Sequence, residues 1–361
     1  MPSTPTIGVF DSGFGGLTVL RALLPLLPNA NYIYLGDTAR LPYGSKSRET
    51  IARYAVSSAK FLHEQGAELL VIACNTATAL ALEDIQSALP IPVIGVVEPG
   101  AQAALTLSSK NSGEYSPCHP ERSAAESKDL RCASLTTTSD APDSRSTETV
   151  LSRVPHVRDS LIVANVGEPP QPSNLTTTKR AVILSAAKDP CISLEPPPTS
   201  TKAQVLVLAT AATVQSHAYT RALNALGLEA YEKACPLLVP LVEEGWIDHP
   251  ITDEVLKIYL TEALTAAPAT QTLLLGCTHY PLLEPAIRRT LASLNHPLHI
   301  IDSAQATAHT VAAHSAIARR SEHIAQNCLF YATDSIEKFQ RLGSNFLGQP
   351  VTGVRHIDLG G

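Results

Sequence analysis

The chain has 361 residues, a length that suits about two domains of roughly 150 residues each. Apolar residues make up 44% and charged residues 17%, so a sizeable core can form, and the formal net charge of −6 argues against a nucleic-acid partner. No apolar run is long enough to span a membrane and no secretory leader is recognisable, so we expect a cytoplasmic protein without a membrane partner. Seven cysteines without a CxxC pair argue against both a disulfide framework and a zinc ribbon.

Short apolar runs alternate with segments of helical periodicity over the first hundred residues. The pattern predicts strands at residues 6–10, 32–35, 68–73 and 92–96, with helices at 17–27, 49–64 and 77–89. The same alternation returns near residue 204, with strands at 205–209, 272–275 and 298–301. We therefore expect an α/β fold of two lobes, each with a mainly parallel sheet flanked by helices.

Residues 107–203 differ in composition from the rest of the chain. They contain eleven prolines, twenty-six serines or threonines and one aromatic residue, Tyr115. Such a segment buries too little apolar surface to repay the cost of ordering it. We expect a low-complexity insertion in a helix-to-strand loop, and a small third domain is the alternative.

The first strand ends at a polar, glycine-rich turn. Asp11 and Ser12 follow it directly, and side chains at the carboxyl end of a parallel strand face the crevice where ligands bind. A dinucleotide-binding turn is an alternative, but Thr18 stands where its third glycine would be. A third reading makes Asp11 and Ser12 a simple helix cap.

Two cysteines occupy equivalent positions in the two halves of the chain. Cys74 and Cys277 each follow a fully apolar strand and precede a predicted helix, and His279 lies two residues beyond Cys277. A helix N-terminus stabilises a thiolate, which predicts lowered thiol pKa values. A buried, inert cysteine is the alternative for each residue taken singly.

Two thiols facing each other across a cleft are suited to symmetric proton transfer. One thiolate removes a proton from a tetrahedral carbon and the opposite thiol protonates the other face, which inverts the centre. A metal site would need further ligands that do not appear at recognisable spacing, and a redox disulfide between the lobes is the remaining alternative.

The chain resembles the glutamate racemases of the cofactor-independent aspartate/glutamate racemase superfamily. The resemblance rests on segments that run in order along the chain outside the insertion: residues 8–16, 36–44, 73–76, 97–100, 209–213, 234–244 and 276–281. It implies interconversion of L- and D-glutamate, supplying D-glutamate for peptidoglycan, with no cofactor and no metal. It allows a homodimer. An aspartate racemase, or a binding protein impaired by its insertion, is the alternative.

The resemblance also implies the domain limits and the site residues. The first lobe would comprise residues 1–99 and about 304–361, and the second residues 100–303, interrupted by the insertion at about 107–203. Cys74 and Cys277 would exchange protons, assisted by Asp11 and His279, with Asp37 and Glu243 as further polar groups of the site. The substrate-binding residues would be Asp11, Ser12, Tyr43, Gly44, Asn75, Thr76, Thr210, Thr213, Thr278 and His279.

Overall fold

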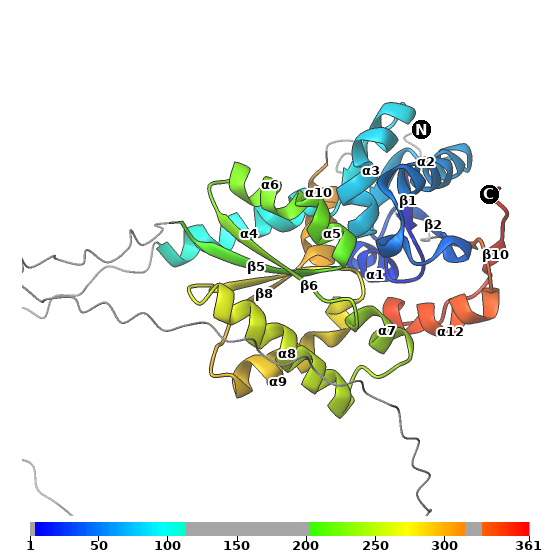
Figure 1. Ribbon diagram of the computed structural model, residues 1–361. Helices are drawn as coiled ribbons and strands as arrows, with labels where there is room; N and C mark the ends of the chain where they lie inside the picture. The colour runs from blue at the N-terminus through cyan, green and yellow to red at the C-terminus, as the bar shows by residue number, and fades with distance from the viewer. Residues whose placement is uncertain (1–3, 113–201, 315–326, 361) are drawn as a thin grey trace, which may run out of the picture. The chain divides into compact units, whose positions relative to one another are not determined.

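The computed structural model describes residues 4–112, 202–314 and 327–360 (Figure 1). All strands in these ranges belong to two parallel sheets, and helices cover the sheets. In Figure 1 the second sheet lies between helices α4 and α6 on one side and α8 and α9 on the other. The predicted two-lobed α/β class is therefore confirmed.

The first sheet has six strands in the order β10-β9-β2-β1-β3-β4. Its strands are β1 (Thr6–Asp11), β2 (Asn31–Gly36), β3 (Leu69–Ile72), β4 (Val93–Gly95), β9 (Cys328–Ala332) and β10 (Arg355–His356). The helices of this part are α1 (Leu17–Leu26), α2 (Arg48–Glu64), α3 (Asn75–Ala88) and α12 (Ile336–Leu347), with short 3₁₀ turns at Thr38–Arg40 and Tyr43–Ser45.

The second sheet has four strands in the order β6-β5-β7-β8. They are β5 (Gln204–Ala209), β6 (Glu229–Ala234), β7 (Thr272–Gly276) and β8 (His299–Asp302). The remaining helices are α4 (Val97–Ser112), α5 (Ala211–Ser216), α6 (Ala218–Ala225), α7 (Leu238–Glu243), α8 (Pro250–Ala266), α9 (Glu284–Ser293) and α10 (Ser303–Ala313), with a 3₁₀ turn, η3, at Tyr280–Leu283.

The two sheets repeat one strand order. The order β2-β1-β3-β4 in the first corresponds to β6-β5-β7-β8 in the second. From β1 the chain goes to β2 on one side and then returns to β3 on the other side, and β5, β6 and β7 repeat this reversal. Ligands of open parallel sheets bind at the carboxyl ends of the strands beside such a reversal. This topology directs the search for a site to the residues that follow β1, β3, β5 and β7.

The core is built from the alternation of side chains along these strands. Alternate residues of β1, β3, β5 and β7 join one continuous apolar cluster that includes both sheets, whereas the intervening residues pack under the outer helices. Because side chains alternate faces along a strand, each fully buried strand contributes to two layers of the core.

The elements predicted by residue range are confirmed, but strands β6 and β10 were not predicted and helix α4 extends into the segment assigned to the insertion. Strand β6 was not predicted, because its sequence, Glu-Ala-Tyr-Glu-Lys-Ala, is a half-buried edge strand without an apolar run. Helix α4 continues to Ser112, so the first six residues assigned to the insertion are helical. The rest of that prediction lies outside the described residues, and the exact domain limits stay a prediction. None of the described helices is long and apolar enough to cross a membrane.

Candidate active site

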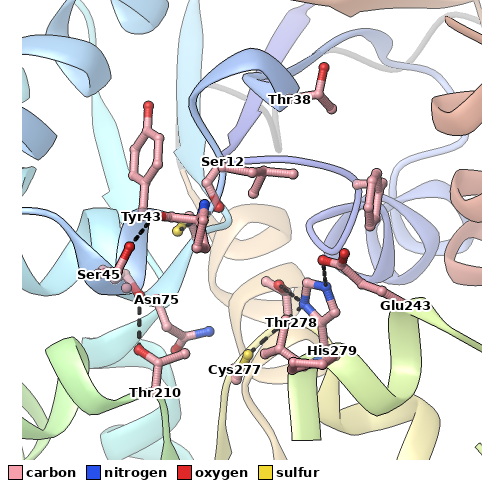
Figure 2. Close-up of a pocket in the computed structure, with 18 of the residues that line it drawn as sticks. Ser12, Thr38, Tyr43, Ser45, Asn75, Thr210, Glu243, Cys277, Thr278 and His279 are labelled. Carbon is pink, nitrogen blue, oxygen red and sulfur yellow. Dashed lines mark hydrogen bonds and ion pairs between the residues drawn. The ribbon is translucent and has the colours of Figure 1, made fainter. Parts of the chain in front are cut away.

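A cavity of about 680 Å³ opens at the carboxyl ends of the strands of both sheets (Figure 2). Eleven of the predicted site residues line it: Ser12, Tyr43, Gly44, Cys74, Asn75, Thr76, Thr210, Glu243, Cys277, Thr278 and His279. Asp11, Asp37 and Thr213 lie behind this lining and contact residues that belong to it. The topology thus brings segments that are 200 residues apart in sequence to one cavity.

Cys74 caps helix α3. Its side chain is 6% exposed, and its Sγ accepts the backbone N–H of Ala77 at 3.4 Å. The thiol also donates to the Ser12 hydroxyl at 3.5 Å. Strand β3 ends two residues earlier, so the predicted position of this cysteine between strand and helix is confirmed.

Cys277 follows strand β7 directly but does not cap an α-helix. The 3₁₀ turn η3 comes next, and α9 begins only at Glu284. The side chain is 5% exposed, and its Sγ lies 4.0 Å from Nδ1 of His279. Both cysteines are free thiols.

The expectation of lowered thiol pKa values is wrong. Burial, followed by the Asp11 carboxylate, raises the pKa of Cys74 to about 11, although the Ser12 hydroxyl and backbone N–H groups act in the opposite direction. Burial also raises the pKa of Cys277 well above its ordinary value, despite the backbone N–H of His279. Desolvation of a thiolate outweighs the stabilisation that a helix end supplies.

Two buried aspartates stand behind the lining. Asp11 accepts the backbone N–H of Gly13 at 2.8 Å, and burial raises the pKa of its carboxyl, against the charge of His279 and three backbone N–H groups. It does not cap α1, whose N-cap is Gly16. Asp37 accepts the Tyr43 hydroxyl at 2.6 Å and therefore acts on the cavity by orienting that ring.

Asn75 presents an unused donor to the cavity. Its Oδ1 accepts the Tyr219 hydroxyl at 2.6 Å, which fixes the amide, while its Nδ2 is buried without a hydrogen-bond partner among the described residues. Oδ1 of Asp11 is buried in the same way. Asp11 lies behind the lining, whereas Asn75 is part of it. Leaving a buried polar atom unpaired is costly, so the open donor of Asn75 at the cavity wall indicates a polar ligand.

Three threonine hydroxyls connect the two lobes at the cavity. Thr76 on α3 lies 3.1 Å from Thr210 and 3.3 Å from Thr213, measured between Oγ1 atoms, and Thr210 caps α5. Thr210 and Thr213 are 3.0 Å apart. Hydroxyls can donate and accept, so this cluster can rearrange its hydrogen bonds toward a carboxylate or an ammonium group.

His279 is held on several sides. Its Nε2 lies 3.3 Å from Oε1 of Glu243, and its Nδ1 faces the Thr278 hydroxyl at 3.4 Å as well as Cys277 (Figure 2). The ring also meets Phe346 edge-on at 4.9 Å and Phe14 at 6.2 Å between centroids. Because a carboxylate only accepts, Nε2 carries the proton in the neutral ring and Nδ1 is left as an acceptor.

Several residues of the site were not found from the sequence. Phe14 and Lys338 line the cavity, and Tyr219 and Phe346 hold Asn75 and His279. Phe14 lies inside the glycine-rich segment 8–16, which was a usable signal, whereas α12 carries no motif. Within the described ranges, no group of three or more His, Cys, Asp or Glu side chains could hold a metal ion.

Comparisons with known proteins agree with this geometry. The family described as Asp/Glu/Hydantoin racemase matches residues 9–113 and 185–311, more than half of the chain. The glutamate racemase of Koribacter versatilis is 40% identical over 381 residues, covering 99% of this chain and 98% of that protein.

Solved structures agree as well. Glutamate racemase from Thermus thermophilus in complex with β-chloro-D-alanine is 32% identical with a TM-score of 0.65, and that from Francisella tularensis in complex with D-glutamate is 26% identical with a TM-score of 0.66. Each match covers 99% of this chain and 98% of the other. With one buried thiol from each sheet at a shared cavity and a family match over most of its described length, the chain belongs to the Asp/Glu/hydantoin racemase family.

Proposed function

We propose that this chain is a glutamate racemase that interconverts L- and D-glutamate by moving the α-proton between Cys74 and Cys277. The observation that carries the proposal is that two buried free thiols, one after β3 and one after β7, line the same cavity. The substrate is taken from the relatives, which are named glutamate racemases, and one of them was solved with D-glutamate.

In this mechanism one cysteine acts as a base and the other as an acid. The thiolate of one takes the α-proton, so an S–H bond forms as the Cα–H bond breaks, and the electron pair left on Cα is delocalised into the α-carboxylate. The opposite thiol then gives its proton to the other face of Cα and becomes the thiolate. The reverse reaction exchanges the two roles, and no external reductant, oxidant or cofactor is needed.

The polar residues of the cavity suit an amino acid. The unpaired Nδ2 of Asn75 and the hydroxyls of Thr76, Thr210 and Thr278 can donate to a carboxylate. The buried Asp11 carboxylate, which lies behind the lining next to Ser12, can supply a negative charge opposite the substrate ammonium group. That positive charge would lower the raised pKa values of the two thiols.

The test is solvent deuterium exchange at Cα. Incubated with L-glutamate in D₂O, the wild-type chain should incorporate deuterium and form D-glutamate, as followed by mass spectrometry and chiral chromatography. Cys74→Ser should abolish racemisation, because a serine hydroxyl is far too basic to be deprotonated near neutral pH.

The alternatives give different results in the same assay. Exchange into L-aspartate but not L-glutamate would identify an aspartate racemase. Thermal stabilisation by glutamate without any exchange would identify a binding protein and overturn the proposal. A cytoplasmic location, a role in peptidoglycan synthesis and a homodimer belong to the same proposal, and light scattering coupled to size-exclusion chromatography tests the dimer.

A further inference from the structure

Lys338 is the single lysine or arginine among the described residues that line the cavity. It lies on α12, between β9 and β10 of the six-stranded sheet, and its side chain is 50% exposed. Its Nζ lies 3.9 Å from Oε2 of Glu243, the last residue of α7 in the other part of the molecule. The ammonium also lies 5.7 Å from the ring centroid of Phe14. This ion pair therefore connects the two lobes at the edge of the cavity.

The pair continues as a chain of contacts toward one thiol. Glu243 contacts Lys338 through Oε2 and His279 through Oε1, at 3.3 Å from the ring nitrogen Nε2. The other ring nitrogen of His279, Nδ1, lies 4.0 Å from Sγ of Cys277. Two intermediate side chains thus link Lys338 to Cys277, whereas among the described residues no comparable series of contacts links it to Cys74.

We propose that Lys338 is a positioning residue for the Cys277 half of the reaction. It keeps the Glu243 carboxylate directed at Nε2 of His279, so that the ring presents its unprotonated Nδ1 to the Cys277 thiol. This inference rests on the proposed racemase function for its role in turnover, but the effect on the thiol itself can be measured without substrate.

The rest of α12 is consistent with such a role. Phe346, on the same helix, packs edge-on against the His279 ring at 4.9 Å. Helix α12 therefore contacts the imidazole directly through Phe346 and is linked to it indirectly through the pair of Lys338 with Glu243 of α7. An ion pair this exposed is screened by solvent, so we expect its removal to change rates by about threefold rather than by orders of magnitude.

The experiment compares Lys338→Met with Lys338→Arg in the full-length chain. Methionine keeps an unbranched side chain of similar length but removes the charge, and arginine restores the charge. Arg341→Met is the matched control, because Arg341 is an exposed cation on the same helix that does not line the cavity. Lys338→Gln replaces the methionine variant if thermal melting shows that the latter is misfolded.

The first readout is the rate of alkylation of each cysteine by iodoacetamide without substrate, followed by peptide mass spectrometry. We expect Cys277 to react about threefold more slowly in Lys338→Met, because its proton acceptor is no longer held in place. Cys74 should react at the wild-type rate and serves as the control within the same molecule. Lys338→Arg and Arg341→Met should match the wild type at both cysteines.

The second readout is turnover with glutamate, where kcat should fall about threefold in Lys338→Met with little change in KM. Equal slowing of alkylation at both cysteines would overturn the inference in favour of a structural role for Lys338. A raised KM with unchanged kcat and unchanged alkylation would overturn it in favour of direct substrate binding. If the wild type does not racemise glutamate but the selective effect on Cys277 is present, the proposed function fails while the role of Lys338 stands.

Discussion

The two thiols of the cavity occupy equivalent places in two sheets of the same strand order, but their surroundings differ. Cys74 caps an α-helix, donates to Ser12 and lies close enough to the buried Asp11 carboxylate for that charge to raise its pKa. Cys277 precedes a 3₁₀ turn and faces the imidazole of His279, which is itself held by Glu243.

The two sheets determine where the thiols lie, whereas the residues near each thiol determine its chemical surroundings. The repeated strand order brings both thiols to one cavity, because in each half the thiol follows the strand beside the reversal in chain path. The groups near the two thiols differ in chemistry: the charge of the Asp11 carboxylate acts on Cys74, and the His279 imidazole lies 4.0 Å from Cys277. The two sides should therefore be separable by mutation.

The largest expected effect comes from replacing either thiol. Cys74→Ser and Cys277→Ser should each lower racemisation at least about a thousandfold, since proton transfer in both directions needs both thiols. Elimination of hydrogen halide from a β- or γ-substituted substrate needs only the abstracting thiol. The resemblance to the family predicts that Cys74 acts on the D-isomer. Cys74→Ser should then retain elimination from the L-isomer, and Cys277→Ser should retain it from the D-isomer.

Chloride or fluoride release from each enantiomer, measured for both variants, checks this assignment. Identical residual preferences would show that the thiols are not opposed bases. Cys328→Ser is a suitable control, because this free cysteine lies on β9 and does not line the cavity.

A second, smaller effect distinguishes the two proton partners. Asp11→Asn should slow elimination from the D-isomer by about a hundredfold, and His279→Gln should slow elimination from the L-isomer by a similar factor, with weaker effects on the opposite isomer. The physical reason is that each group is the charged or basic neighbour of one thiol. The measurement is the initial rate of halide release for each of the two variants with each of the two isomers. Equal slowing of both isomers in both variants would contradict the assignment of one partner to each thiol.

Gly15 offers a way to disturb the Cys277 side alone. A Cβ on Gly15 would lie 2.3 Å from the Thr278 hydroxyl and 2.7 Å from the His279 ring, whereas a Cβ on Gly44 would have its nearest contact at 3.6 Å, with Thr210. Gly15→Ala should therefore lower the free energy of unfolding by about 1–3 kcal/mol and displace His279, while Gly44→Ala should fold as the wild type does. Urea unfolding of both variants measures the difference. Equal midpoints would show that the residues around Gly15 move to accommodate the Cβ without loss of stability.

The pH dependence of turnover tests a property that both thiols share, namely a raised pKa. With both thiols protonated in the free enzyme, the active form is the one that has lost a single proton from the pair. Because the lower pKa, that of Cys74, is raised to about 11, kcat/KM should rise by about tenfold per pH unit between pH 7 and 9, in both reaction directions. Steady-state assays over this range measure the slope. A plateau near pH 7 would show that a thiol is already ionised in the free enzyme.

The same raised pKa has a consequence for stability. The unfolded chain releases the thiol proton at lower pH than the folded chain does, so the stabilising contribution of the protonated thiol is complete below about pH 9 and is lost as pH rises toward 11. The free energy of unfolding should therefore fall over that interval, and Cys74→Ser should reduce the slope of this fall.

Much of the fold could be predicted from the sequence, because buried parallel strands are continuous apolar runs that end at polar or glycine-rich turns. The runs before Asp11, Cys74, Thr210 and Cys277 all became strands of the two sheets. Strand β6 could not be predicted in this way, since an edge strand pairs through its backbone while its side chains remain charged and half-buried.

The sequence by itself determined which residues end the strands and that two of them are cysteines in matching positions. The tertiary structure decided what surrounds them. Burial of both thiols reversed the pKa shift that local helix position predicts, because desolvation depends on all neighbouring chain segments and not on the adjacent turn. Likewise, Phe346 packs on His279 and Lys338 pairs with Glu243 because β9 pairs with β2, which brings α12 to a cavity also lined by residues near the start of the chain. Such contacts arise from strand pairing between distant segments, so the sequence around Lys338 or Phe346 does not predict them.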